Sequence, residues 1–486
     1  MKYSRPFASI RGFLLIAIAS SAQAGQQSDY YLREEIPLPE NEVMEIGSIA
    51  LMPDQKVAVT TRRGDLWICE GAYADDLSRV TWSKFAENLH EPLGMFWKDD
   101  SLWVHQRPEF TRITDTDGDG RGDQFETISS GWGLSGDYHE YNFGSDPDKD
   151  GNVWNVLCLT GSANAKADWR GWSMRITPEG KTIPTCSGIR SPGGIGFNAQ
   201  GDAFYTDNQG LWNGSSSLKW LKPGSFQGNP TGNKYHKLAD LPEPPNPESG
   251  SRILTERKKF PELIPPAVVF PHGKVGQSPT GIITDQTKGK FGPFAGQVFV
   301  GEQTHSQVQR VCLEQVNGIY QGAVFLFLED FESGLVPIRL ADDGTLFAGG
   351  TNRGWASRGS KTFTFERVRW TGTVPFEIHT ITARPDGFEL TFTEPVDPDT
   401  ASDPDSYSMA SWTYIYQSGY GSPEVDKTTP KVTAAVVSPD KTRVRLTIEG
   451  MVQGHVHQLD AKSVRSSTGE QLWHPTAYYT LNEIPK

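Results

Sequence analysis

One pattern recurs six times along the chain: a short apolar run, a turn with Asp, Asn or Gly, and a second run ending in aromatic or small residues. The paired runs are 47–54 with 57–60, 92–97 with 101–104, 138–143 with 150–154, 192–198 with 201–205, 279–283 with 296–300, and 335–340 with 344–348. Most copies are separated by about 45 to 55 residues, the length of one four-stranded propeller blade. Each hairpin alone would expose an apolar face, which radial packing buries. The repeats therefore predict an all-β fold with a six-bladed β-propeller over residues 40–370.

The gap between the fourth and fifth copies is much longer than the others. It holds a segment rich in Pro and Gly, residues 222–271. Prolines disfavour a central strand, so we expect a long loop over one face of the propeller. Long ordered loops serve function or structure, and the sequence does not choose between the two.

The pattern changes after Trp370. Residues 376–383 and 387–392 alternate apolar and polar side chains around an Asp-Gly turn, and residues 432–437 and 443–448 repeat this layout around a Pro-Asp turn. A segment of this length suits a two-sheet sandwich. We therefore expect an Ig-like β-sandwich over residues 374–484, joined to the propeller by a short linker.

The first 24 residues have the composition of a signal peptide. Lys2, Arg5 and Arg11 precede the short apolar run 13–19, and Ala22-Gln23-Ala24 is a small-x-small cleavage site. The alternative is a membrane anchor, but the run is too short to span a bilayer. Cleavage removes three basic residues and takes the formal charge from -13 to -16. We expect a periplasmic or secreted protein with no membrane span after cleavage, and its acidity makes nucleic acid an unsuitable partner.

Four cysteines remain in the mature chain: Cys69, Cys158, Cys186 and Cys312. No C-x-x-C or C-x-x-C-H spacing is present, which argues against an attached c-type haem or a zinc knuckle. Export permits disulfides, and four cysteines allow three pairings. Isolated buried thiols are an equal alternative.

The segment 115–123 reads Asp-Thr-Asp-Gly-Asp-Gly-Arg-Gly-Asp. Carboxylates at alternate positions, with glycines for a tight turn, supply several hard oxygens to one point, as calcium requires. We expect Asp115, Asp117, Asp119 and Asp123 to hold a structural calcium ion. The alternative is a solvated hairpin tip.

His139 and Arg190 stand just before the first apolar runs of the third and fourth copies. Equivalent positions of successive blades lie at one radius and one height, so we expect the two residues on one face, within about 10 Å. A His near neutral pKa beside an Arg suits abstraction of a proton or hydride from an alcohol. The alternative is a His bonded within its blade and an Arg paired with a carboxylate. Polar clusters at other strand ends accompany them, at 207–210, 302–305 and 351–355.

The block from His139 to Gly301 resembles the glucose/sorbosone dehydrogenase family, six-bladed propellers that use pyrroloquinoline quinone (PQQ). His139 precedes a hairpin, 148–154, that matches the family's pattern, and Arg190 opens an Arg-Ser-Pro-Gly-Gly segment. The resemblance implies His139 as catalytic base and Arg190 as its electrostatic partner. It also implies that Arg190, Ser191, Gln303 and His305 face a PQQ cofactor.

The chain departs from this family at two charged positions. Gln303, Thr304 and His305 stand where the family has a quinone-contacting Lys, and Gly334, Leu335 and Val336 stand where it has Arg-x-Arg. A closer likeness is to secreted propeller proteins of planctomycete and verrucomicrobial bacteria, which carry similar Asp-Gly motifs. Those proteins often end in a cytochrome c module, which the sandwich replaces here.

Two functions follow from these observations. The first is oxidation of a sugar or alcohol, with His139 as base and a separate electron acceptor. The second is a non-catalytic propeller that binds carbohydrate or a secreted protein and has lost the quinone site. Retention of His139 and Arg190 favours the first, and the missing cations favour the second.

Overall fold

The computed structural model describes residues 25–352 and 354–486. The predicted signal peptide, residues 1–24, lies outside this part of the chain. Among the described residues, no helix combines the length and the apolar character needed to cross a bilayer.

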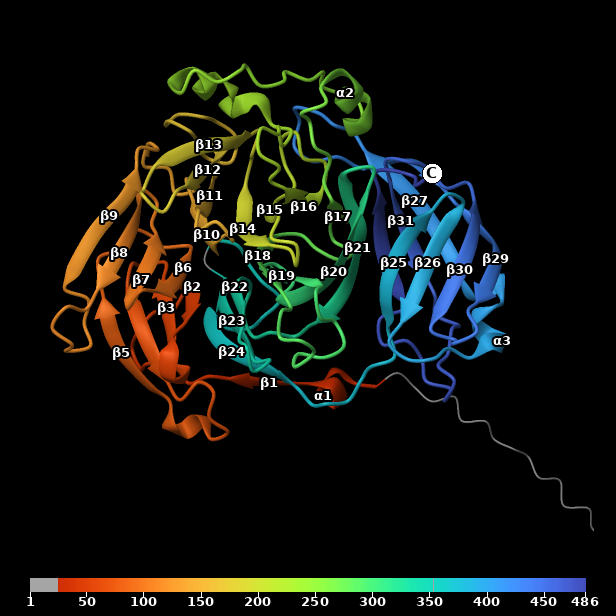
Figure 1. Ribbon diagram of the computed structural model, residues 1–486, viewed down its shortest axis with the longest axis horizontal. Coiled ribbons are helices and arrows are strands. Elements are labelled where there is room, and N and C mark those ends of the chain that lie inside the picture. Colours follow the sequence, from red (N-terminus) through yellow and green to blue (C-terminus); the bar gives the residue numbers. More distant parts are fainter. Residues whose placement is uncertain (1–24, 353) are drawn as a thin grey trace, which may run out of the picture.

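Antiparallel four-stranded units, formed by strands that follow one another along the chain, build the larger part of the protein (Figure 1). The first four units are β2 (Ile46–Leu51), β3 (Val57–Thr61), β4 (Leu66–Glu70) and β5 (Thr81–Ala86); β6 (Met95–Lys98), β7 (Ser101–His105), β8 (Glu109–Thr114) and β9 (Gln124–Ser130); β10 (Asn142–Pro147), β11 (Val153–Leu157), β12 (Trp172–Ile176) and β13 (Thr182–Ser187); and β14 (Pro192–Phe197), β15 (Ala203–Asp207), β16 (Ser216–Trp220) and β17 (Val268–Phe270). The next two are β18 (Pro279–Thr284), β19 (Val298–Glu302), β20 (Gln307–Val316) and β21 (Ile319–Leu328); and β22 (Leu335–Leu340), β23 (Leu346–Thr351) and β24 (Phe363–Trp370), completed by β1 (Tyr31–Glu35).

The first strands of these units form a closed ring. Contacts run from β2 to β6, β10, β14, β18 and β22 in turn, and from β22 back to β2. Glycines permit this close approach: a Cβ on Gly94 would lie 2.8 Å from the Cα of Gly144, and one on Gly194 would lie 2.8 Å from the Cα of Gly281. A closed radial ring of antiparallel sheets is a β-propeller. The all-β prediction is confirmed.

The N-terminal strand β1 closes the ring by joining the last sheet. It pairs with β24 from Tyr31↔Trp370 to Glu35↔Glu366. This strand precedes residue 40, so the predicted start of the propeller omitted it. The sequence repeat could not reveal β1, because it lies far from the strands that it pairs with.

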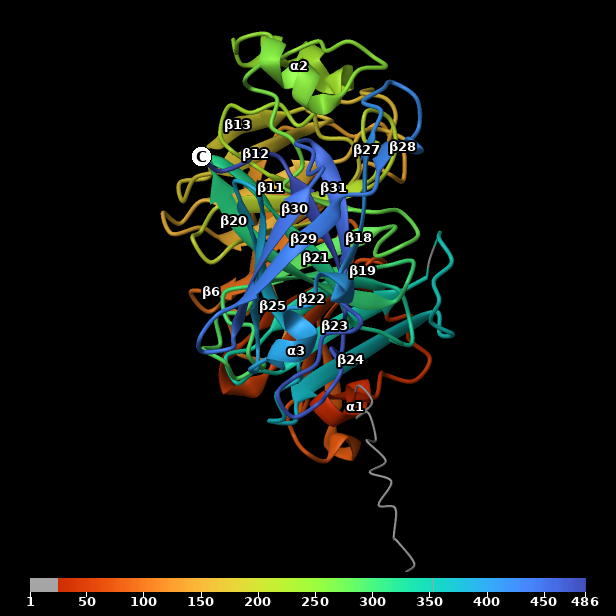
Figure 2. The same ribbon diagram turned by 90° about the vertical axis from the view of Figure 1, so that its right-hand side faces the viewer.

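The C-terminal region contains two sheets around one apolar core (Figure 2). The first sheet has the order β25 (Ile378–Arg384), β26 (Gly387–Phe392), β30 (Arg443–Glu449) and β29 (Lys431–Val437). The second has the order β32 (Thr476–Leu481), β31 (His455–Asp460), β27 (Ser408–Tyr414) and β28 (Glu424–Thr428). The short helices α1 (Gln27–Tyr30) and α3 (Pro398–Ala401) lie outside these sheets.

The two regions share a continuous sheet. Strand β32 pairs with β21 through Gly322↔Thr480, Ala323↔Tyr479 and Val324↔Tyr478, so that β18–β21 and the second C-terminal sheet make eight strands. The buried side chain of Arg310, on β20, donates to the carbonyl of Ile378 at 2.8 Å and lies 3.7 Å from Glu377. The C-terminal region is therefore built onto the propeller rather than held by a free linker.

The segment 222–271 runs along the outer edge of the propeller in Figure 1, where a loop over one face was expected. It contains a 3-10 segment, Pro230–Leu238, and the helix α2 (Ile253–Lys259), and it ends in the edge strand β17. Phe226 and Leu263 pack with Tyr416 of the C-terminal region. The segment therefore links the outer edge of the propeller to the second region.

All four cysteines are buried, and none forms a disulfide. Burial raises the pKa of Cys186 to about 11 and the pKa of Cys69 to about 12. They therefore pack as small apolar residues and are poor nucleophiles.

Candidate functional site

His139 lies in the turn that precedes β10, three residues before the strand begins. Its backbone N–H donates to Oδ1 of Asp137 at 2.9 Å, and its Nδ1 lies 3.6 Å from the same oxygen. The ring packs against Tyr138, with centroids 3.9 Å apart, and against Tyr141 and Trp355 at 6.1 and 6.2 Å. The side chain keeps 19% of its surface exposed.

Electrostatics keep His139 uncharged near neutral pH. Partial burial lowers its pKa below the usual value, Asp137 opposes this effect, and the positive charge of Arg190 adds to it. Burial alone would raise the pKa of Asp137, but hydrogen bonds from the backbone of His139 and Gly161 outweigh it and lower that pKa. The site therefore holds a neutral imidazole beside a fixed carboxylate, which is the state that a general base needs.

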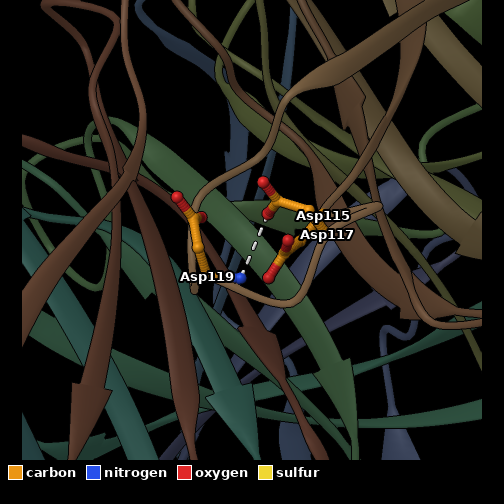
Figure 3. A group of neighbouring side chains, drawn as sticks. All are labelled: Asp115, Asp117 and Asp119. Carbon is orange, nitrogen blue, oxygen red and sulfur yellow. Dashed lines mark hydrogen bonds between the residues drawn. The ribbon is translucent and has the colours of Figure 1, made fainter.

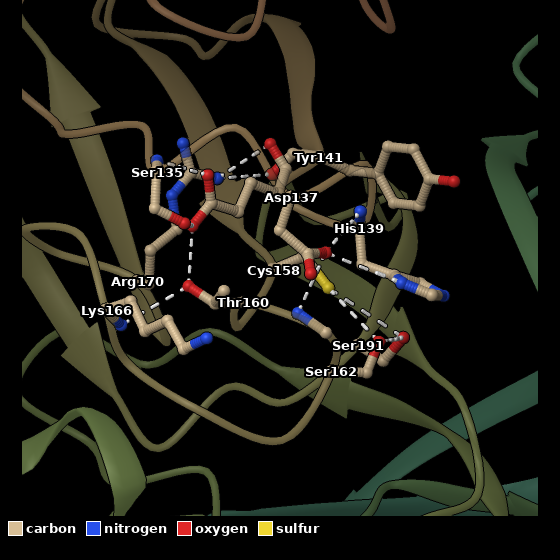
Figure 4. A network of polar contacts seen from close by, with 12 residues as sticks. Ser135, Asp137, His139, Tyr141, Cys158, Thr160, Ser162, Lys166, Arg170 and Ser191 are labelled. Atoms are coloured by element: carbon tan, nitrogen blue, oxygen red, sulfur yellow. Dashed lines mark hydrogen bonds and ion pairs between the residues drawn. The ribbon is translucent and has the colours of Figure 1, made fainter.

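Hydroxyl and thiol groups connect this turn to the start of β14 (Figure 4). Asp137 also accepts the N–H of Gly161 at 3.0 Å, and the neighbouring Ser162 hydroxyl lies 3.2 Å from that of Ser191. The Cys158 thiol contacts the carbonyl of Arg190 at 3.5 Å. His139 and Arg190 thus belong to one connected cluster, although no direct bond joins them.

Arg190 is 6% exposed and its guanidinium is held by backbone. Its Nη1 donates to the carbonyls of Gln209 at 2.8 Å and Asn208 at 3.3 Å, and its Cζ lies 5.2 Å from the ring centre of Tyr420. A Cβ at Gly210 would lie 1.9 Å from the guanidinium carbon, so any larger residue there would displace the Arg190 side chain from this position. The alternative considered for Arg190 was an ion pair with a carboxylate. In the structure its guanidinium is bound by backbone carbonyl groups.

The neighbouring cations are also engaged. Arg62 donates to Glu91 at 2.7 Å and to the Tyr141 hydroxyl at 3.2 Å. Arg107 lies 3.6 Å from Glu91 and donates to the carbonyl of Glu140 at 3.2 Å. Arg62 and Arg107 therefore share one carboxylate, that of Glu91, and their further donors bond to the Tyr141 hydroxyl and the Glu140 carbonyl.

A buried network supports the turn that carries His139. The fully buried Arg170 donates to the carbonyls of Glu140 and Tyr141 at 2.9 and 3.0 Å. The Glu140 carboxylate accepts from Thr160 at 2.5 Å and from the Ser135 backbone at 2.7 Å. Arg170 and Glu140 are both buried and hold the turn that carries His139 in place, so they are positioning residues.

The remaining predicted cofactor residues lie at the end of β19. The Gln303 amide donates to the carbonyls of Trp355 at 2.9 Å and Thr351 at 3.3 Å, so it holds the loop that presents Trp355 to His139. Burial lowers the pKa of His305, and the Glu302 carboxylate partly opposes this effect. Arg353, within the predicted 351–355 cluster, lies outside the described residues.

A PQQ cofactor carries three carboxylates and needs free cations. Of the four residues predicted to face it, Arg190 alone is a cation, and its guanidinium is bound to carbonyl groups. Gln303 is bound to backbone, and the Ser191 hydroxyl is bonded to Ser162. Val336, at a position where the resembling family has cationic residues, lines the central cavity instead. The described residues do not fit this cofactor.

The acidic loop between β8 and β9 brings three of its four predicted ligands together (Figure 3). Carboxylate oxygens of Asp115, Asp117 and Asp119 lie within 4.8 Å of one another. Asp123 does not join them, because its two oxygens accept the N–H and hydroxyl of Thr116 at 2.9 and 2.6 Å. Within the described part of the chain, this is the one such group of His, Cys, Asp or Glu side chains.

Two cavities are lined by other residues of the protein. One of about 350 Å³ follows the first strands of the propeller, and the paired Arg339 and Asp146, 2.7 Å apart, lie at its wall. Another, of about 550 Å³, lies between α2 and the C-terminal region. The lining of neither cavity includes His139 or Arg190.

Sequence reasoning missed three residues of this site. Tyr141 and Asp137 flank the predicted His139 and could have been named from the same motif. Tyr420 could not have been found, because it comes from a loop of the C-terminal region that approaches Arg190 only in the folded chain.

Comparisons with known proteins bear on the fold. The family model described as Domain of unknown function (DUF7133) matches residues 74–347. A Thermus thermophilus protein described as an oxidoreductase (glucose dehydrogenase) is 17% identical over 70% of this chain and 99% of its own, with a TM-score of 0.51. A Trichoderma reesei carbohydrate-active enzyme of family AA12 is 10% identical over 74% and 100%, with a TM-score of 0.50.

The PQQ-bound aldose sugar dehydrogenase of Streptomyces coelicolor is 13% identical over 70% of this chain and 98% of its own, with a TM-score of 0.47. No curated protein matches the chain significantly. The structural neighbours include sugar dehydrogenase propellers, which confirms the predicted likeness of fold. At these identities the likeness concerns the fold alone.

Proposed function

Because the chain belongs to the family described as Domain of unknown function (DUF7133), whose description states no activity, we propose a function from the site itself. The protein binds a sugar or an alcohol on the propeller face around His139, and His139 accepts a proton from a hydroxyl of that ligand. Arg190 is its electrostatic partner. The proposal also includes export of the protein, a six-bladed propeller and an Ig-like C-terminal sandwich. It includes as well the likeness to secreted propeller proteins of planctomycete and verrucomicrobial bacteria.

The neutral His139 held by Asp137 carries this proposal. Its Nδ1 lies 3.6 Å from the Asp137 carboxylate, close enough for that charge to stabilise the imidazolium that forms when the ring takes a proton. The pKa of His139 lies below its usual value, so the imidazole is ready to accept a proton at neutral pH. The ring of His139 is partly exposed and lies beside a carboxylate, whereas a histidine that only fills the core would need neither feature.

The hydrogen-bonding groups at the site suit a neutral ligand that carries several hydroxyls. The guanidinium groups of Arg62, Arg107 and Arg190 are each bound by carboxylate or carbonyl oxygens, and Nε of Arg190 is a buried donor without a partner among the described residues. Ligand hydroxyls can accept from such donors without displacing the existing partners. Sugars and alcohols present such hydroxyls. Oxidation would require a separate electron acceptor, and no step is assigned to PQQ because the described residues do not fit it.

A second candidate follows from the same engaged cations. A propeller whose arginines are occupied can bind a carbohydrate or a secreted protein without converting it. In that case His139 would serve as a hydrogen-bond partner for the ligand and not as a base.

An activity assay separates the two candidates. The wild type, His139→Ala and the control His236→Ala, in the outer segment, are incubated with aldoses and polyols and a reducible dye, with and without PQQ and calcium. Dye reduction or loss of substrate in the wild type and the control, and not in His139→Ala, supports catalysis. Binding without turnover supports the second candidate. Absence of both binding and turnover refutes the proposal.

The acidic loop belongs to the proposal as a structural calcium site. Asp115, Asp117 and Asp119 supply closely grouped oxygens, and Asp123 braces the loop through Thr116. Carboxylate oxygens at a tight turn suit a hard cation. Its place at an outer hairpin, away from His139, gives the ion a role in stability and not in chemistry.

A further inference from the structure

Exposed Tyr and Trp side chains contact both residues of the candidate site, His139 and Arg190. Among the described residues, the large hydrophobic side chains that remain exposed include one tryptophan and two tyrosines: Trp355 at 59%, Tyr138 at 50% and Tyr420 at 69%. Exposed aromatic rings in a cluster mark a binding surface, whereas single exposed apolar residues need no explanation. All three belong to the site of His139 and Arg190.

Two of these rings flank the imidazole. Tyr138 lies 3.9 Å from the ring of His139 and Trp355 lies 6.2 Å from it, from loops of different sheets. The Gln303 amide holds the carbonyl of Trp355 at 2.9 Å, which fixes the loop behind the indole. Tyr138 and Trp355 therefore border the position where a hydroxyl would meet His139.

The third ring comes from the C-terminal region. Tyr420 lies over the guanidinium of Arg190, with 5.2 Å between Cζ and the ring centre. Its loop is tied to the propeller by the N–H of Gly421, which donates to Gly210 at 2.9 Å, and by the N–H of Trp212, which donates to Gln417 at 2.8 Å. The backbone that carries Tyr420 is therefore fixed to the propeller beside Arg190.

The exposure of the Tyr420 ring leaves it accessible to a ligand. A ring that stays 69% exposed gains little from burial, and the loop that carries it already holds the propeller through backbone bonds. Tyr and Trp offer large, rigid, amphipathic contact area at low entropic cost. Sugar rings present C–H faces that pack on aromatic rings and hydroxyls that bond to the polar groups between them.

We propose that Tyr420 forms a second sugar subsite, so that the ligand is the end of an oligosaccharide and not a free monosaccharide. This inference rests on the proposed function: one sugar unit meets His139 between Tyr138 and Trp355, and the next packs on Tyr420 beside Arg190. The hydrogen-bonding groups proposed to meet the ligand suit an uncharged chain. The C-terminal region thus contributes to recognition as well as to stability.

Calorimetric titration with glucose, cellobiose, maltose, cellotriose and maltotriose tests the inference. The wild type should bind at least one of the longer sugars roughly 3- to 10-fold more tightly than glucose, the effect expected of one aromatic contact. In Tyr420→Ala this ratio should fall to about one, whereas Tyr420→Phe should retain it. Phe125→Ala removes another exposed aromatic ring, on β9, and should leave the ratio unchanged.

The outcomes separate the subsite from the function on which it rests. Equal weakening of glucose and longer sugars in Tyr420→Ala, or no change in the ratio, overturns the subsite while sugar binding stands. A wild type that binds glucose as tightly as every longer sugar also overturns it. A wild type that binds and converts no sugar refutes the proposed function itself.

Discussion

Replacing Asp137 with Asn should lower the pKa of His139. The carboxylate lies 3.6 Å from Nδ1 and raises the pKa of the ring, against the lowering effects of burial and of Arg190. Asn keeps the shape and still offers an oxygen to the backbone N–H groups of His139 and Gly161. The substitution therefore removes the charge while preserving the turn.

The size of the shift follows from Coulomb's law. Two unit charges 3.6 Å apart interact by about 1.2 kcal/mol in a water-like medium, which corresponds to roughly 0.8 pKa unit. Asp137 is 34% exposed, so solvent screens the pair, whereas the partly buried ring strengthens it. We expect the pKa of His139 to fall by about 0.5 to 1 unit.

Histidine ring C–H signals followed by NMR between pH 4 and 8 measure this pKa without a substrate. The signal that disappears in His139→Ala identifies the residue, and Asp440→Asn, an exposed carboxylate in the C-terminal region, is the control. An unchanged or higher pKa in Asp137→Asn would refute the assigned electrostatics. It would also remove the argument that Asp137 supports His139 as a base.

Three further results are expected. Arg310→Met should cost about 3 to 5 kcal/mol in urea unfolding, because it leaves the buried Glu377 carboxylate with His474 as its remaining side-chain partner, and adding Glu377→Gln should restore part of the loss. Burial lowers the pKa of His105 and of His457 to about 3, so the unfolded chain binds more protons than the folded chain below pH 6.5. The free energy of unfolding should therefore fall by about 2 kcal/mol for each of these histidines between pH 7 and pH 5. In His105→Phe, the part of this decrease that comes from His105 should disappear. Calcium should bind in isothermal titration and raise the melting temperature, and Asp117→Ala should abolish both effects; unchanged binding would exclude the acidic loop as the site.

The repeats revealed most of the strands because each hairpin satisfies local rules. The predicted runs 192–198 and 335–340 coincide closely with β14 and β22, and the four runs predicted after Trp370 coincide with β25, β26, β29 and β30. The run 138–143 was placed too early, since residues 138–141 form the turn that carries His139 and β10 begins at Asn142. Aromatic residues in that turn imitate a strand pattern.

Long-range features were beyond the reach of the sequence. The pairing of β1 with β24, and of β32 with β21, joins segments that lie far apart in the sequence, and no local signal encodes such partners. The same reason hid Tyr420 from the candidate site. His139 and Arg190 could be named because propeller symmetry relates their positions. The hydrogen bonds from Arg190 to the carbonyls of residues 208 and 209 depend on the folded path of that loop, which the sequence does not reveal.

The central claim is that a neutral sugar or alcohol meets the imidazole of His139. Its most direct test is titration of the tightest-binding sugar into the wild type while the ring C–H signal of His139 is followed by NMR. The account predicts that this signal shifts and saturates, and that the dissociation constant from the shift equals the one measured by calorimetry. The ring signal of the buried His457 should show no comparable shift. Calorimetric saturation that leaves the His139 signal unmoved would place the sugar elsewhere and contradict the account.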